Sequence, residues 1–148
     1  MKKLIYTLLV IIALTNNSFS AGTASDSSDS SSNYMKAKNL IKAAKKYEKK
    51  GKIEKAQKKY AKAQTLLIKS NEKKPLQADT LNYLGFTTRK FGDYEKGEKF
   101  YLLGLQVEPN HNGINEYLGE LYVATNRMDM AKERLEVLKP VTVKNLTN

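Results

Sequence analysis

The chain has 148 residues, contains no cysteine and carries a formal net charge of +11 from 26 basic and 15 acidic residues. Its length is that of a single domain, and a hydrophobic content of 41% is sufficient for a folded core. The absence of cysteine excludes disulfides, thiolate metal sites and a cysteine nucleophile.

Residues 1–20 have the organisation of an export signal. Two lysines precede an apolar run at residues 4–14, and the small residues Ser18 and Ser20 suit signal-peptidase cleavage. The run is shorter than the ~20 residues that a membrane-spanning helix needs. We therefore predict a signal peptide and a periplasmic or secreted protein, with an uncleaved N-terminal membrane anchor as the alternative.

Residues 21–33 are rich in serine and aspartate and contain no large apolar side chain. Such a segment cannot bury enough apolar surface to offset the entropy of ordering it. The composition predicts a disordered linker, and Ser32 or Asn33 is the expected N-cap of the helix that follows.

From Tyr34 onward, apolar residues recur at spacings of three and four, which predicts amphipathic helices. Gly51, Gly92 and Asn126 interrupt this periodicity, and both residue types tolerate the left-handed backbone that ends a helix. Pro75 suits the first turn of the third helix. The interruptions predict three helical hairpins, over residues 34–71, 76–107 and 111–139, with Pro140 ending the last helix and an unstructured tail at residues 141–148.

The hairpins share a repeated pattern of large and small residues. Leu84-Gly85 recurs 34 residues later as Leu118-Gly119, and Tyr101 falls on Leu135 at the same interval. Glycine inside a helix costs ~1 kcal/mol relative to alanine. We therefore expect the second helix of each hairpin to approach the first closely at these glycines, with Tyr101 and Leu135 filling the adjoining space.

This pattern resembles the tetratricopeptide repeat over residues 37–140, with repeats at about 37–71, 78–111 and 112–140. The residues that carry the resemblance are Leu84, Gly85, Gly92, Asp93, Tyr94, Glu95, Gly97, Tyr101, Gly104, Pro109, Leu118, Gly119, Tyr122 and Ala131. The resemblance implies an all-α domain at residues 34–140, a right-handed solenoid of three antiparallel hairpins. It also implies a non-catalytic scaffold whose first helices line a concave groove for a peptide or partner protein.

Carried over to this chain, the groove positions of the family form one set. They are Lys38, Lys42, Lys45, Lys49, Asn82, Tyr83, Phe86, Arg89, Glu116, Tyr117 and Glu120. Some family members grip a C-terminal carboxylate with a lysine and asparagine clamp, but the matching places here hold Ile41, Lys45 and Tyr83. A chaperone tail is therefore not the expected ligand. The three aromatic residues of the set are either exposed anchors for a peptide or part of the core.

Positive charge is concentrated in the first hairpin. Residues 34–78 contain 15 lysines and 3 glutamates, whereas residues 79–148 contain 9 basic and 10 acidic residues. The lysines at 38, 42, 45 and 49 share one helical face. This face is a solvated surface, a site for an acidic protein segment, or, as the alternative function, an adhesion surface for an anionic membrane or envelope polymer. Nucleic acid is disfavoured because clustered arginines and a base-reading motif are missing.

Few residues could support catalysis. The sequence after residue 33 contains a single serine, Ser70, and the chain contains a single histidine, His111. Ser70 has no nucleophile elbow around it. Glu116 and Glu120, four residues apart, could form an acid/base pair or bind a cation, although a solvated helix face is the simpler interpretation. We predict no catalytic residue, no cofactor and no metal.

The last predicted hairpin is not followed by a polar capping helix, which repeat arrays usually carry. Leu135, Val137 and Leu138 would then expose apolar surface. We therefore predict either marginal stability of this hairpin or its coverage by a partner or by a second copy of the chain, which would form a homo-oligomer.

Overall fold

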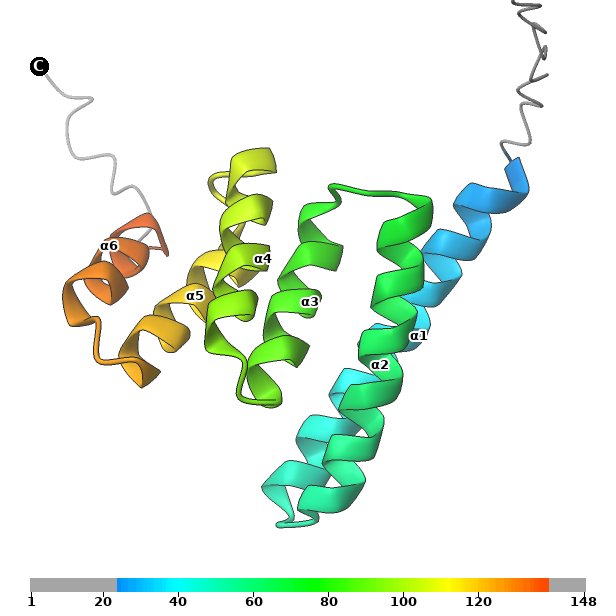
Figure 1. Ribbon diagram of the computed structural model, residues 1–148, viewed down its shortest axis with the longest axis horizontal. Coiled ribbons are helices and arrows are strands. Elements are labelled where there is room, and N and C mark those ends of the chain that lie inside the picture. Colours follow the sequence, from blue (N-terminus) through cyan, green and yellow to red (C-terminus); the bar gives the residue numbers. More distant parts are fainter. Residues whose placement is uncertain (1–23, 139–148) are drawn as a thin grey trace, which may run out of the picture.

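The computed structural model describes residues 24–138, which fold into six helices arranged as three consecutive hairpins (Figure 1). The helices are α1 (Ala24–Lys49), α2 (Ile53–Lys73), α3 (Ala78–Lys90), α4 (Tyr94–Val107), α5 (Asn112–Ala124) and α6 (Met128–Leu138). Residues 24–138 contain no strand. The predicted all-α array of three helix hairpins is confirmed. The predicted signal peptide and C-terminal tail lie outside the described residues.

The turns inside the hairpins lie where the sequence predicts them. Gly51 and Gly92 have φ values of 68° and 88°, and Asn126 has a φ of 58°. Glycine adopts this left-handed conformation without a steric penalty, and asparagine tolerates it. A further positive φ, 57° at Leu76, lies in the connection between α2 and α3. The sequence predicts Pro75 in the first turn of the third helix. That prediction is wrong, because α3 begins at Ala78 and Pro75 lies in the connection before it.

The prediction of a disordered linker at residues 21–33 is wrong from Ala24 onward, because α1 begins there. Ser30 and Asn33 are 4% and 7% exposed, so Asn33 is an interior helical residue and not an N-cap. Ser30 Oγ donates a hydrogen bond to the Ser70 carbonyl (3.1 Å), and Ser70 Oγ donates one to the Ser30 carbonyl (3.0 Å). Composition misled here because α2 is long enough to supply a second surface, against which small serine side chains pack with their hydroxyl groups satisfied.

The amide groups of Ser30 to Asn33 should therefore exchange slowly with deuterated solvent. Their hydrogen bonds belong to a helix that packs against α2, and exchange requires that this part of α1 opens first. Hydrogen exchange followed by mass spectrometry measures the effect directly. Exchange at the rate of an unstructured peptide would contradict the assignment of this segment to α1.

The second hairpin is closed by a large ring against a glycine. Tyr101 of α4 is fully buried, and a Cβ atom added to Gly85 of α3 would lie 2.6 Å from its Cε1 atom. Gly104 brings α4 close to Ile114 of α5 in the same way. The predicted close approach at Gly85 is confirmed, and the two contacts explain glycines that otherwise weaken a helix.

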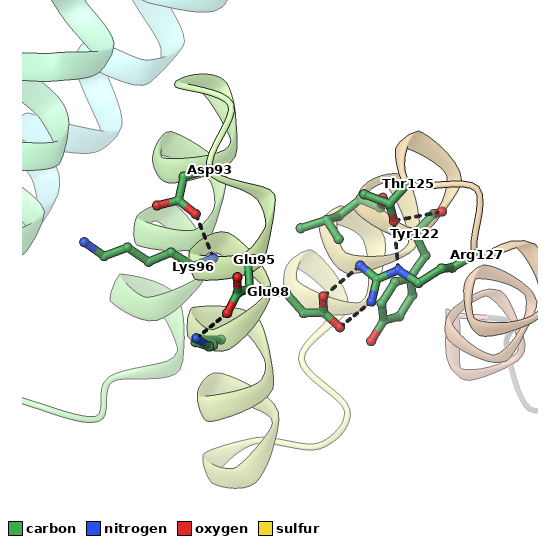
Figure 2. Close-up of polar contacts among 9 residues, drawn as sticks. Asp93, Glu95, Lys96, Glu98, Tyr122, Thr125 and Arg127 are labelled. Atoms are coloured by element: carbon green, nitrogen blue, oxygen red, sulfur yellow. Dashed lines mark hydrogen bonds and ion pairs between the residues drawn. The ribbon is translucent and has the colours of Figure 1, made fainter.

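Hydrogen bonds from Arg127 join the second and third hairpins (Figure 2). Its guanidinium group donates two hydrogen bonds to the carboxylate of Glu98 on α4, at 2.9 and 2.7 Å. The same group lies over the ring of Tyr122, with 4.6 Å between Cζ and the ring centroid. Bidentate pairs of this kind fix geometry as well as adding energy. They fasten the turn between α5 and α6 to α4, and so hold the third hairpin against the second.

The third hairpin lacks the packing that the repeat pattern predicts. Leu135 is 54% exposed and does not fill the space beside Gly119, where Cβ of Arg134 lies nearest, 3.5 Å from a Cβ atom added there. No residue of α6 is buried. The expectation for Leu135 is therefore wrong. A leucine in the place of Tyr101 lacks the ring that would span the gap between the helices.

Candidate functional site on the inner face

The first helices of the three hairpins meet on one surface, which we call the inner face. Lys45 Nζ of α1 donates a hydrogen bond to the hydroxyl group of Tyr117 on α5 (2.7 Å). Phe86 of α3 contacts the same tyrosine, with 4.9 Å between ring centroids. Tyr34 and Tyr83 join α1 to α3 with 6.0 Å between their rings. Side chains from all three hairpins thus form one continuous surface.

Lys45 has an unusual set of partners for a lysine. Its ammonium group lies 4.6 Å from the ring centroid of Phe86 and 4.9 Å from that of Tyr117. Among the side chains of residues 29–138, no carboxylate forms an ion pair with it. Ring faces and a phenol hydroxyl group hold a cation in place without neutralising it. Lys45 therefore presents its ammonium group to the inner face without a direct carboxylate partner, although its charge is felt by Glu48.

The neighbouring cations, in contrast, are paired with carboxylates. Lys90 Nζ lies 2.7 Å from Oε1 of Glu48, and Arg89 is paired with Glu120. Burial opposes ionisation of Glu48, but hydrogen bonds from Lys90 and Tyr60 outweigh burial, and the pKa of Glu48 is lowered below its ordinary value. Glu48 therefore stays ionised and neutralises Lys90. Lys45, whose charge also lowers the pKa of Glu48, is the cation of this cluster that has no direct ion pair.

A pocket of about 310 Å³ lies beside Lys45, between α1 and α3. Its lining consists of Met35, Lys38, Asn39, Ile41, Lys42, Lys45 and Tyr83. Tyr83 is half-buried, and burial raises the pKa of its hydroxyl group, which stays protonated as a hydrogen-bond donor. Three ammonium groups, an aromatic ring and two apolar side chains thus surround one hollow, and the mixture suits a ligand that is both acidic and partly apolar.

The predicted groove residues divide into those that share this surface and those that do not. Lys38, Lys42, Lys45, Tyr83, Arg89, Tyr117 and Glu120 lie in the pocket or in the Lys45 cluster. Phe86 is only 2% exposed and Asn82 is 5% exposed, so both belong to the core and neither can anchor a ligand by its exposed surface. The ring of Phe86 instead packs against the ammonium group of Lys45. Lys49 is the last residue of α1 and lies outside the lining of this pocket.

Glu116 lies on a different surface from the rest of the set. It lines a hollow of about 300 Å³ between α5 and α6, together with Gly119, Val123, Met128, Leu135 and Leu138 among others. The exposed leucine and methionine side chains agree with the expectation that this hairpin exposes apolar surface. The predicted homo-oligomer through this face remains a prediction.

Two members of the inner face were not predicted from the sequence. Tyr34 precedes Lys38 by four residues, and Lys90 follows Phe86 by four, so both spacings place the missed residue on the same helical face as a predicted one. Tyr34 was missed because the serine-rich segment before it was interpreted as a linker, which made α1 too short. Lys90 was missed because its place at the end of α3 does not indicate that its ammonium group lies over the rings of Tyr60 and Phe86.

The candidate catalytic residues have structural roles. The hydroxyl group of Ser70 is engaged with Ser30, as described above. Nδ1 of His111 accepts a hydrogen bond from the amide of Ile114 (3.1 Å) and caps α5, while its Nε2 lies 3.3 Å from Asp79. Within residues 24–138, the side chains that the structure describes include no group of three histidine, aspartate or glutamate residues placed to hold a metal ion. The same residues contain no helix that is both long and apolar enough to span a membrane.

Solved structures share this arrangement of helices. The first tetratricopeptide-repeat domain of Spaghetti (RPAP3), bound to the HSP90 peptide SRMEEVD, is 18% identical with a TM-score of 0.54, and the match covers 76% of this chain and 86% of that domain. The second such domain, bound to the same peptide, is 16% identical with a TM-score of 0.51, over 72% of this chain and 93% of that domain. A mutant of MamA is 16% identical with a TM-score of 0.48, over 69% of this chain and 94% of that one. No protein-family model and no curated protein matches the sequence.

The likeness to the two domains shows the fold. The chain has the tetratricopeptide-repeat fold, an all-α solenoid of helix hairpins, as its repeat pattern predicts.

Proposed function

We propose that the inner face of α1, α3 and α5 binds an acidic polypeptide segment, and that the protein is a non-catalytic interaction or scaffold module. The observation that carries the proposal is the pocket that Lys38, Lys42 and Lys45 share with Tyr83. Three cations converge there on a half-apolar hollow. Because Lys45 lacks a carboxylate partner among the described residues, a bound carboxylate would complete its surroundings without displacing an existing ion pair.

The fold supports a polypeptide as the ligand. The two similar domains of Spaghetti (RPAP3) are each described as bound to an HSP90 peptide that contains two adjacent glutamates and a methionine. At 16–18% identity this likeness carries the fold alone, so the case for an acidic ligand rests on the lysines of this chain. The export signal predicted at residues 1–20 would place the partner in the periplasm or outside the cell.

A titration with synthetic peptides tests the proposal. We expect a fluorescein-labelled peptide of glutamate and glycine with one central phenylalanine to bind, and a version with lysine in place of glutamate to fail. Replacing the phenylalanine by glycine should weaken binding about tenfold, because one anchored aromatic residue contributes roughly 1–2 kcal/mol. Fluorescence anisotropy measures each affinity. Equal affinity for the glutamate and lysine peptides would show that the charge of the inner face does not select the ligand.

A further inference from the structure

A second concentration of lysines lies on α2, away from the inner face. Lys55, Lys58, Lys59, Lys62 and Lys69 fall on one side of this helix, and we call them the lysine stripe. Their spacings of three, four and seven residues keep them on one face over about 21 Å of helix. The residues that α2 buries are different ones, namely Ala56, Tyr60, Ala63, Leu67 and Ser70. The stripe therefore lies on the outward side of the first hairpin.

The stripe lacks direct carboxylate partners, and Lys69 alone of the five contributes to lowering the pKa of a described carboxylate, that of Asp29. No acidic residue occurs between Lys55 and Lys69 in the sequence. Within the described residues, none of the five ammonium groups forms an ion pair, and Lys59 instead lies 5.9 Å from the ring centroid of Tyr47. Like charges crowded on one helix face repel one another. This arrangement costs stability unless an external anion relieves the repulsion.

The stripe also surrounds a hollow. Tyr47 and four lysines, Lys55, Lys58, Lys59 and Lys62, line a depression of about 280 Å³ on the surface of the first hairpin. The lining offers four ammonium groups and a phenol ring. Such a set of donors suits a phosphate group, whose oxygens accept several charge-assisted hydrogen bonds.

From this geometry we propose that the lysine stripe binds the surface of an anionic phospholipid membrane, with a lipid phosphate group in the hollow beside Tyr47. The stripe is outward-facing and extended, so a flat array of headgroups engages all five lysines together. A single soluble phosphate would meet only those around the hollow. Lysine ammonium groups on flexible stems, without the planar fork of arginine, suit an array of charges that has no fixed geometry.

Vesicle binding measured with matched variants tests this proposal. The wild-type protein should co-sediment with vesicles of phosphatidylglycerol and phosphatidylcholine, fail to do so with phosphatidylcholine alone, and be released at about 0.5 M salt. Lys58→Gln/Lys62→Gln should lower the partition coefficient about 25-fold, since each lysine near an anionic surface contributes about fivefold. The control Lys38→Gln/Lys42→Gln removes the same charge from the inner face and should stay within about twofold of the wild type.

Three results would overturn the proposal. Equal losses for the two variants would mean that net charge alone attracts the protein to the vesicle. Binding to neutral vesicles would exclude the charge of the stripe as the cause. Binding of soluble inorganic polyphosphate without binding of vesicles would assign the stripe to a soluble polyanion. Because the variants change different lysines, failure here leaves the peptide site on the inner face untouched, and circular dichroism confirms that both variants fold.

Discussion

Replacement of Tyr101 by alanine should lower the free energy of unfolding by about 3–5 kcal/mol, the usual cost of truncating a fully buried aromatic side chain. Tyr101 is the side chain that fills the space above Gly85, and the glycine has no atoms with which to close the resulting cavity. Domains of this size are stable by only about 5–15 kcal/mol. The change should therefore remove a large share of the total stability.

Tyr94→Ala is the matched control for this experiment. Tyr94 lies on the same helix but is 40% exposed, and we expect a change within about 0.5 kcal/mol. Urea denaturation followed by circular dichroism at about 222 nm, a wavelength that reports helix content, measures both variants. Similar small losses for the two tyrosines would contradict the role of Tyr101 as the element that closes the second hairpin.

Reversal of the charges of Lys42 and Lys45 should weaken binding of the acidic peptide about 100-fold, or ~2.7 kcal/mol. Both lysines line the pocket between α1 and α3, and glutamates there would repel the carboxylates of the ligand. Because Lys45 also rests on Phe86 and Tyr117, the Lys42→Glu/Lys45→Glu variant needs a melting curve beside the binding isotherm. Fluorescence anisotropy with the labelled peptide gives the affinity.

Two further variants make this result specific. Lys38→Glu/Lys42→Glu carries the same change in charge at two exposed positions of the pocket, and it should also lose binding while keeping its melting temperature. Lys58→Glu/Lys62→Glu carries the same change on the lysine stripe and should bind the peptide like the wild type. If the stripe variant lost as much affinity as the pocket variants, the peptide would not be bound on the inner face.

Local signals account for the parts of the fold that could be predicted from the sequence. The turns at Gly51, Gly92 and Asn126 depend on a residue type that tolerates positive φ, and that information lies in a single position. The contact of Gly85 with Tyr101 follows from a pattern that repeats along the chain. Such features need no knowledge of distant neighbours.

The features that were missed depend on surfaces that other segments supply. Ser30 is buried only because α2 continues to Lys73, and composition carries no trace of that contact. Phe86 and Tyr83 both fall on the groove side of α3 in the repeat pattern, yet Phe86 is buried. The difference arises because Lys45 and Tyr117 cover Phe86 from two other helices.

Nuclear magnetic resonance gives the most direct test of the central claim, that the inner face binds an acidic polypeptide. Addition of the glutamate peptide to 15N-labelled protein should shift the amide signals of Lys38, Lys42, Lys45, Tyr83 and Tyr117, and leave those of Lys58 and Lys62 in place. Shifts confined to the lysine stripe on α2, or to the hollow between α5 and α6, would contradict it.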